Sequence, residues 1–156
     1  MQTFKDNAGR EWQIDITVNT VKRVNDLVDV KLTDPTSGNP PLLALLSTDI
    51  VAFCDLLYAI VKPQAESLGV SDEEFGRALG GDAIYAAMQA FWEELRDFFQ
   101  KLRRTEMVTA ITKLGEVRDA AIAAAVARVS AEADRQIGTL SGNSPESLES
   151  TPAPSP

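Results

Sequence analysis

The sequence has no histidine and only one cysteine among its 156 residues. Histidine is the most common side chain for proton transfer near neutral pH and the most common metal ligand. Its absence excludes most catalytic triads, zinc hydrolases and histidine kinases. The lone Cys54 cannot form a disulfide within the chain, and it cannot build a cysteine cluster around a metal. These absences leave few enzyme classes open.

Positive charge is also scarce. The chain carries 15 Lys and Arg residues against 23 Asp and Glu residues, which gives a net charge of −8. Such a chain repels phosphate backbones as a whole, and its one dense basic run is Lys-Leu-Arg-Arg at 101–104. Nucleic acid is therefore not an expected partner.

Long apolar runs are missing. No uninterrupted run approaches the ~20 apolar residues that span a bilayer, and the first residues contain no apolar core of signal-peptide length. The acidic balance also disfavours adhesion to anionic membranes. We expect a cytoplasmic protein with no membrane partner.

The N-terminal region predicts a β-hairpin. Residues 3–5 and 11–18 flank a turn-forming segment, Asp-Asn-Ala-Gly, at 6–9. Three apolar residues alternate with polar ones in the second arm, which is the period of a half-buried strand: Trp12, Ile14 and Ile16.

A short helix follows the hairpin in this interpretation. Asn19 can cap it, and apolar residues recur at helical spacing over about three turns, at Val21, Val24, Leu27 and Val28. Beyond the helix, Val30 and Leu32 alternate with charged residues, so a third strand beside the hairpin stays open.

From Leu42 onward the pattern predicts helices only. Ser47 or Thr48 can cap the first helix, which we expect to end near Lys62 because Pro63 disfavours helical geometry in the residue before it. Its apolar residues predict a buried helix: Ile50, Phe53, Cys54, Leu57, Ile60 and Val61.

Two more helices are marked by their ends. The sequence Ser-Asp-Glu-Glu at 71–74 has the form of a capping box, and the pair Gly80 and Gly81 would end the short helix that it begins. Asp82 can cap the next helix, which runs to about Leu102.

The last predicted helix runs from about Thr105 to Gln136, and six of its eight residues at 120–127 are alanine, which has the highest helix propensity. After it the composition changes to Ser and Pro. Only Leu140 and Leu148 are large and apolar among residues 138–156, which therefore cannot bury enough surface to order themselves.

The predicted fold class is α+β and mostly α: a short N-terminal β-hairpin, with a third strand open, followed by a bundle of about four to five helices and a disordered C-terminal tail. Residues 1–137 form a single globular domain, in which 1–33 hold the small sheet with its short helix and 42–137 the helical part. Residues 138–156 are the tail.

The helix from Asp82 has an unusually wide apolar face. Six residues lie close to one line, at about 100° per residue: Ile84, Met88, Phe91, Leu95, Phe98 and Leu102. Tyr85, Trp92 and Phe99 lie to one side of that line. Two interpretations stay open for these three aromatics: they complete the core under the last helix, or part of them forms a partner-binding surface.

The remaining reactive residues have structural interpretations. Cys54 lies on an apolar stripe with no histidine to activate it, so we interpret it as a core cysteine. Of the acidic clusters, 72–74 belongs to a helix cap and 93–94 to a solvent face. The glycine-rich segment 76–82 lacks the Lys-Ser/Thr ending of a phosphate cradle and is interpreted as a turn between helices. We predict no catalytic, cofactor-binding or metal-binding residue, and no enzyme.

Several segments together resemble small proteins encoded in the tail modules of long-tailed phages and prophages. They are TFKDNAGREW at 3–12, VKRV at 21–24, VSDEEFGRALGGDAI at 70–84 and GNSPES at 142–147. These relatives are described as tail assembly chaperones, and the resemblance covers nearly the whole chain without including any catalytic signature.

The resemblance implies a non-enzymatic role. Such chaperones coat the long tape-measure protein and help recruit tail-tube subunits, and they are absent from the mature virion. The family often makes a short product and a longer one by ribosomal frameshift, and this chain would be the short one. The partners that the resemblance implies are the tape-measure protein and the tail-tube protein, and self-association of the chain stays open beside them. The competing hypothesis is a structural tail-completion or head–tail connector protein of the virion.

Overall fold

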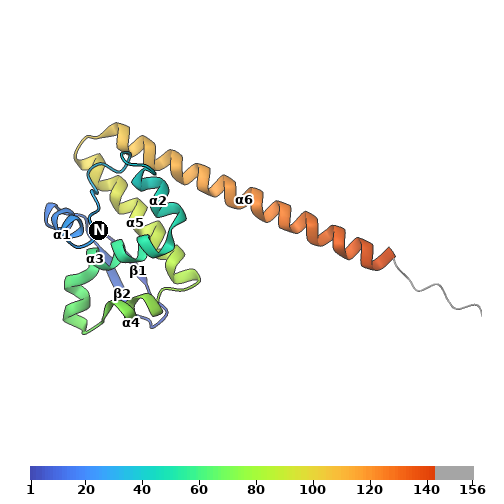
Figure 1. Ribbon diagram of the computed structural model, residues 1–156, viewed down its shortest axis with the longest axis horizontal. Coiled ribbons are helices and arrows are strands. Elements are labelled where there is room, and N and C mark those ends of the chain that lie inside the picture. The colour runs from blue at the N-terminus through green and yellow to red at the C-terminus, as the bar shows by residue number, and fades with distance from the viewer. Residues whose placement is uncertain (143–156) are drawn as a thin grey trace, which may run out of the picture. The chain divides into compact units, whose positions relative to one another are not determined.

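The computed structural model describes residues 1–142, with side chains to residue 140 (Figure 1). The elements in chain order are β1 (Gln2–Lys5), β2 (Glu11–Ile14), α1 (Val18–Val28), α2 (Leu42–Thr48), α3 (Ile50–Leu68), α4 (Asp72–Arg77), α5 (Asp82–Lys101) and α6 (Thr105–Gly142). This order confirms the predicted class, a hairpin followed by helices. The contacts divide the chain into two units, Met1–Gly115 and Glu116–Pro156.

The predicted hairpin forms from β1 and β2, which pair antiparallel with Phe4 opposite Trp12. Phe4, Trp12 and Ile14 are buried, and their neighbours within the strands are exposed, so the predicted alternation holds. The turn closes where the N–H of Gly9 donates to the Asp6 carbonyl at 3.1 Å, and Gly9 adopts a positive φ of 80°. Glycine takes this conformation without steric cost.

The third strand that the sequence left open does not form, and the sheet among the described residues has two strands. Asp29 ends α1 in the left-handed conformation with φ 53°, and the N–H of Asp34 then donates to the Lys31 carbonyl at 3.1 Å. The chain turns here instead of extending. Leu32 is nevertheless fully buried. The apolar residue that suggested a strand is therefore a buried residue of a loop.

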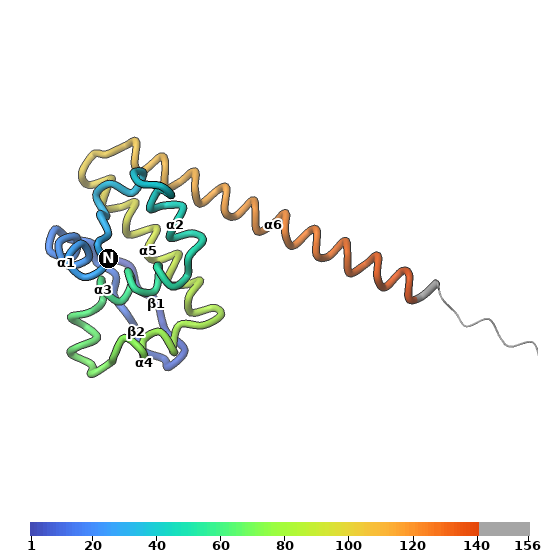
Figure 2. The backbone as a smooth tube through the Cα atoms, in the orientation of Figure 1, coloured from blue at the N-terminus to red at the C-terminus, as the bar shows by residue number. Residues whose placement is uncertain are grey.

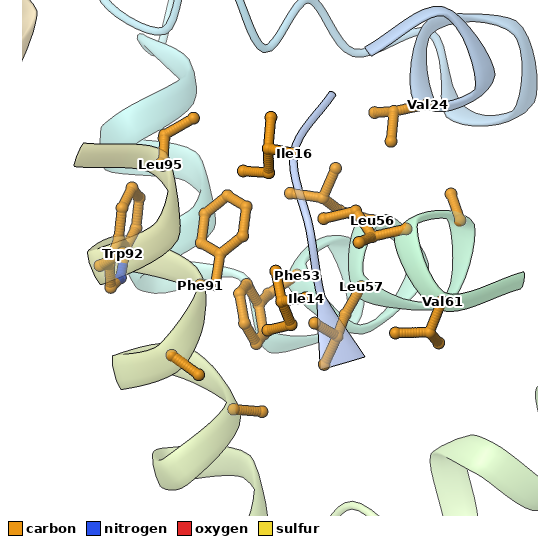
Figure 3. Close-up of a cluster of buried hydrophobic side chains, with 14 of the residues drawn as sticks. Ile14, Ile16, Val24, Phe53, Leu56, Leu57, Val61, Phe91, Trp92 and Leu95 are labelled. Carbon is orange, nitrogen blue, oxygen red and sulfur yellow. The ribbon is translucent and has the colours of Figure 1, made fainter. Parts of the chain in front are cut away.

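The hairpin lies between two helices: β1 packs on α5 and β2 on α3. Figure 3 shows Ile14 of β2 among Phe53 and Leu57 of α3 and Phe91 of α5. The rings of Phe53 and Phe91 meet edge to face with centroids 5.6 Å apart. Burial of these side chains supplies the main driving force for folding, at about 1.5–3 kcal/mol for each large one.

The buried face of α5 differs from the predicted one. Phe91 and Leu95 are fully buried as expected, but Phe98 is only partly buried and Phe99 is fully buried. The cause is a line of small buried residues, Ala83, Ala87 and Ala90, where β1 approaches the helix closely. The sequence prediction counted only large apolar side chains. It therefore centred the buried face on the line through Phe91 and Phe98, away from the alanines.

Helix α3 continues through Pro63, contrary to the predicted end near Lys62, and stops at Gly69 with φ 68°. Proline lacks the N–H that would bond the carbonyl four residues earlier, which belongs to Ala59. The guanidinium of Arg23 in α1 replaces that donor: its Nε donates to the Ala59 carbonyl at 2.8 Å and its Nη2 to the Ile60 carbonyl at 2.7 Å. The missing helical bond is thus supplied from another helix.

Arg23→Leu should therefore destabilise the protein, because it leaves the Ala59 carbonyl without a donor and removes a charged hydrogen bond to the Ile60 carbonyl. We expect the unfolding free energy to fall by about 2–3 kcal/mol, as for loss of hydrogen bonds from a charged group. The control is the same change in a Pro63→Ala background, where residue 63 again has an N–H for the Ala59 carbonyl. Urea unfolding of the four proteins measures the coupling. Equal costs in both backgrounds would contradict this role for Arg23.

The residues that cap four of the helices can be compared with the predicted ones. One cap is confirmed and three differ from the prediction. Thr17, not Asn19, caps α1 by accepting from the Thr20 N–H. Asp49 caps α3 by accepting from the N–H groups of Val51 and Ala52, because Ser47 and Thr48 end the separate helix α2. Ser71 caps α4 as predicted, accepting from the Glu74 N–H at 3.2 Å. Helix α5 begins after Gly81 at φ 55°, with Asp82 as its first residue and not its cap.

Helix α6 begins at Thr105 as predicted, and Met107 and Ile111 from its first turns are buried in the first unit. It continues to Gly142 (Figure 1), so residues 138–142 are helical where the sequence predicted tail. Figure 2 traces the coil of α6 without a break from its start at Thr105. Gly138 alone does not stop it, and the next proline along the chain is Pro145. The remainder of the predicted tail, 143–156, lies outside the described residues.

No single helix in the described part of the chain is long and apolar enough to cross a membrane. Helices α2 and α3 together reach the required length and composition, but the chain bends by 108° between them.

Candidate functional site

The three aromatics singled out in the sequence are placed differently from one another. Trp92 is 8% exposed and Phe99 is fully buried, so both belong to the core of the first unit. Tyr85 is 51% exposed, and its hydroxyl accepts a hydrogen bond from Nε2 of Gln89 one turn later, at 2.9 Å. Partner binding by these residues stays a prediction, and Tyr85 alone is accessible to carry it.

The hairpin turn contains a buried carboxylate that the sequence analysis did not identify. Asp6 accepts from the N–H groups of Ala8 and Arg10 on Oδ1, and from Arg10 Nε and Trp12 Nε1 on Oδ2, at 2.9–3.0 Å. Arg10 also donates to Glu74 of α4 at 2.8 Å. Both oxygens of Asp6 are thus occupied, and the network ties the turn to α4.

Burial alone would raise the pKa of Asp6, but the hydrogen bonds from Trp12 and Arg10 outweigh it, so the pKa lies below its ordinary value of 3.8. A carboxyl group whose folded pKa is depressed stabilises the fold above its unfolded pKa, and this contribution is lost as the pH falls through the folded pKa. The network is structural, because both oxygens of its buried carboxylate, Asp6, are occupied by donors.

Asp6→Asn should lower the unfolding free energy by about 2 kcal/mol at pH 7, because an amide N–H₂ would face the donors of Arg10 and Trp12. The deficit should shrink as the pH falls from about 4, where Asp6 begins to take up a proton in the unfolded chain, through the lower pKa of Asp6 in the folded protein. Tryptophan fluorescence during urea unfolding at pH 7 and pH 3 measures both values. The matched control is Asp15→Asn at an exposed carboxylate. A deficit independent of pH would contradict the assignment.

Glu94 also differs from its prediction, since it is 3% exposed and does not lie on a solvent face. Its Oε1 accepts the Ile16 N–H at 3.2 Å, and its Oε2 lies 2.8 Å from the α-amino group of Met1. Glu94 follows Ala83 and Ala87 at helical spacing, on the line that faces β1. That spacing was the signal in the sequence that could have predicted the burial of Glu94. It places the carboxylate beside the Ile16 N–H and the Met1 amino group, which both need an acceptor.

Cys54 is half-buried on α3, so it lies beside the core and not at its centre. Burial raises the pKa of its thiol, and the carboxylates of Asp55 and Asp72 raise it further. A thiol becomes a nucleophile by losing its proton, and these surroundings oppose that loss. The structure therefore offers no activation of Cys54.

We expect a thiol reagent at pH 8 to label native Cys54 at least about tenfold more slowly than free cysteine, because the thiolate fraction is lower. The rate should reach that of the free thiol in urea. Cys54→Ala is the control for labelling elsewhere, and it should cost about 1 kcal/mol or less of stability because the side chain is only half-buried. Rapid labelling of the folded protein would overturn this assignment.

The acidic and glycine-rich segments are built into helix ends. Residues 72–74 form the first turn of α4, and the segment 76–82 makes the turn into α5, where the Gly80 carbonyl accepts from Asn7 at 3.1 Å. In the described part of the chain, no three His, Cys, Asp or Glu side chains gather closely enough to hold a metal ion. A cleft of about 450 Å³ beside α2 holds Ser37 and Asp34, whose side chains bond one another at 2.7 Å within a turn.

The surface with the clearest binding character lies on α6. Four large apolar residues, which we call the α6 stripe, are between 48% and 78% exposed: Ile122, Val126, Val129 and Leu140. At about 100° per residue they fall within a 60° sector of the helix, in phase with Ile111, which is buried in the first unit. The apolar pattern of this helix therefore continues from Ile111 to Leu140, and the residues of the α6 stripe are exposed among the residues that the structure describes.

Exposed apolar rows on amphipathic helices mark interaction sites in proteins. The sequence indicated the helix but not the exposure of its stripe, because spacing alone does not say which part of an apolar face is covered. No protein-family model, curated protein or solved structure matches the chain.

Proposed function

We propose that the protein is a non-enzymatic tail assembly chaperone of a long-tailed phage or prophage. It binds the tape-measure protein and helps to recruit tail-tube subunits during tail morphogenesis. The observation that supports this proposal is the apolar helix surface that is exposed among the described residues, on α6 above all. Such surfaces bind helical partners through rows of apolar anchors.

The polar residues support a binding role in a second way. The buried carboxylates Asp6 and Glu94 are each held by donors of the chain itself, and the thiol of Cys54 is kept protonated by its surroundings. Groups used in this manner stabilise a fold and present no reactive atom to a substrate.

Within the first unit, Tyr85 is the residue on which the proposal places contact with the tape-measure protein. An aromatic ring with a polar hydroxyl is favoured at the centre of protein interfaces. Its neighbours Trp92 and Phe99 are committed to the core, where truncation would cost about 3–5 kcal/mol and unfold a marginal domain.

Tyr85→Ala should leave the melting temperature within a few degrees of wild type, yet reduce co-purification with co-expressed tape-measure protein at least about tenfold, as loss of an interface anchor does. Leu102→Ala is the matched control, because Leu102 is 52% exposed near the other end of α5. It should change neither property. Melting followed by circular dichroism and quantitative pull-down measure the two effects. Normal binding by Tyr85→Ala would remove this residue from the proposal.

A further inference from the structure

The open end of the hairpin is held by one buried carboxylate. The last pair of the ladder joins Gln2 to Ile14, so Met1 precedes that end and Ile16 follows it. Glu94 of α5 reaches both arms. Its Oε1 accepts from the Ile16 N–H at 3.2 Å, and its Oε2 lies 2.8 Å from the α-amino group of Met1. One side chain of α5 therefore joins the start of β1 to the segment after β2.

The negative charge of this carboxylate depends on a single cation. The Glu94 side chain is almost fully buried, and no other donor of the described residues reaches its Oε2. Among the same residues, no Lys or Arg side chain forms an ion pair with Glu94. A buried charge is costly unless it is paired. The positive charge on the Met1 nitrogen is therefore what balances Glu94.

We propose that the α-amino group of Met1 is a modification site that controls the stability of the first unit, which is complete only while this group is free and charged. Acylation forms a bond from the nitrogen to the acyl carbon, while the ammonium gives up two protons and the acyl donor its leaving group. The product is a neutral amide, which leaves Glu94 buried without a counter-ion. This goes beyond the proposed function, because it concerns the chain with no partner present.

The position of the amino group matters as much as its charge. Removal of Met1 would transfer the free amino group to Gln2, about 3.3 Å further along the strand. Because Gln2 pairs with Ile14 in the ladder, its backbone is held in place and its nitrogen cannot return to Glu94. The ion pair therefore needs Met1 itself as well as a free amino group.

The proposal defines a reaction that must come before the completed fold. Where translation starts with formyl-methionine, the formyl group is an acyl group on this same nitrogen. Its hydrolysis adds one water across the amide bond, releases formate and leaves the nitrogen as an ammonium ion. Amide hydrolysis at Met1 therefore creates the ion pair with Glu94, and removal of the whole residue would destroy it.

The single cysteine allows a direct test on the full chain. A synthetic peptide of residues 1–53 can be ligated to a segment that begins with Cys54, which gives the protein with a free or an acetylated Met1. We expect acetylation to lower the folding equilibrium constant at least about tenfold, because it removes one partner of a buried ion pair. Urea unfolding followed by tryptophan fluorescence measures this constant.

Glu94→Gln separates the ion pair from any other effect of the acetyl group. The amide oxygen of the variant can still accept from the Ile16 N–H, but no buried charge remains for Met1 to balance. In this background acetylation should change the folding constant by less than about twofold. Glu93→Gln is the matched control, since it makes the same change one residue earlier at an exposed carboxylate. It should show the full wild-type effect of acetylation.

Equal effects of acetylation in wild type and in Glu94→Gln would overturn the proposal, as would an acetylated wild-type chain that is as stable as the free one. If the acetylated wild type does not fold at all, folding of the acetylated Glu94→Gln chain supports the proposal, and failure of both overturns it. No tape-measure protein is present, so neither result bears on the chaperone proposal. Failure of the Tyr85 pull-down likewise leaves the role of Met1 intact.

Discussion

A two-stranded hairpin is at best marginally stable in water, and the first unit is organised by the need to cover this one. Covering it requires apolar helix faces on each side, which α3 supplies to β2 and α5 supplies to β1. The alanines of α5 let β1 approach closely, and Glu94 at the end of the same line binds the Ile16 N–H beyond the second strand. The hairpin and the two long helices therefore stabilise one another.

Covering the hairpin also creates polar groups that need partners. Helix α3 is long enough only because it continues through Pro63, and the carbonyls near that proline are bonded by Arg23. The turn of the hairpin is fixed by Asp6, whose buried carboxylate receives four donors. Charged residues such as these are candidates for catalysis when only the sequence is known. In the structure each of them forms hydrogen bonds with the backbone or with another side chain. An unsatisfied buried group would cost about 1–3 kcal/mol.

The sequence predicted the element types well because periodicity and caps are local properties. The hairpin around residues 6–9, the Ser71 cap and the start of α6 could all be read from adjacent residues. Its errors on the end of α3 and on the buried face of α5 occurred where a distant residue intervenes. Arg23 carries α3 past Pro63, and β1 selects the alanine side of α5, which buries Phe99 and leaves Tyr85 exposed. The α6 stripe was visible as a pattern, but its exposure depends on what the rest of the chain covers.

The function that we propose for this chain is temporary binding of other chains during tail assembly. Mass spectrometry of tail assembly intermediates and of mature particles, purified from cells that express the chain, tests this proposal most directly. The account predicts the chain in complexes that contain unassembled tape-measure protein, and its absence from mature tails. A fixed, stoichiometric amount of the chain in mature tails would contradict the account and identify a structural tail-completion or connector protein instead.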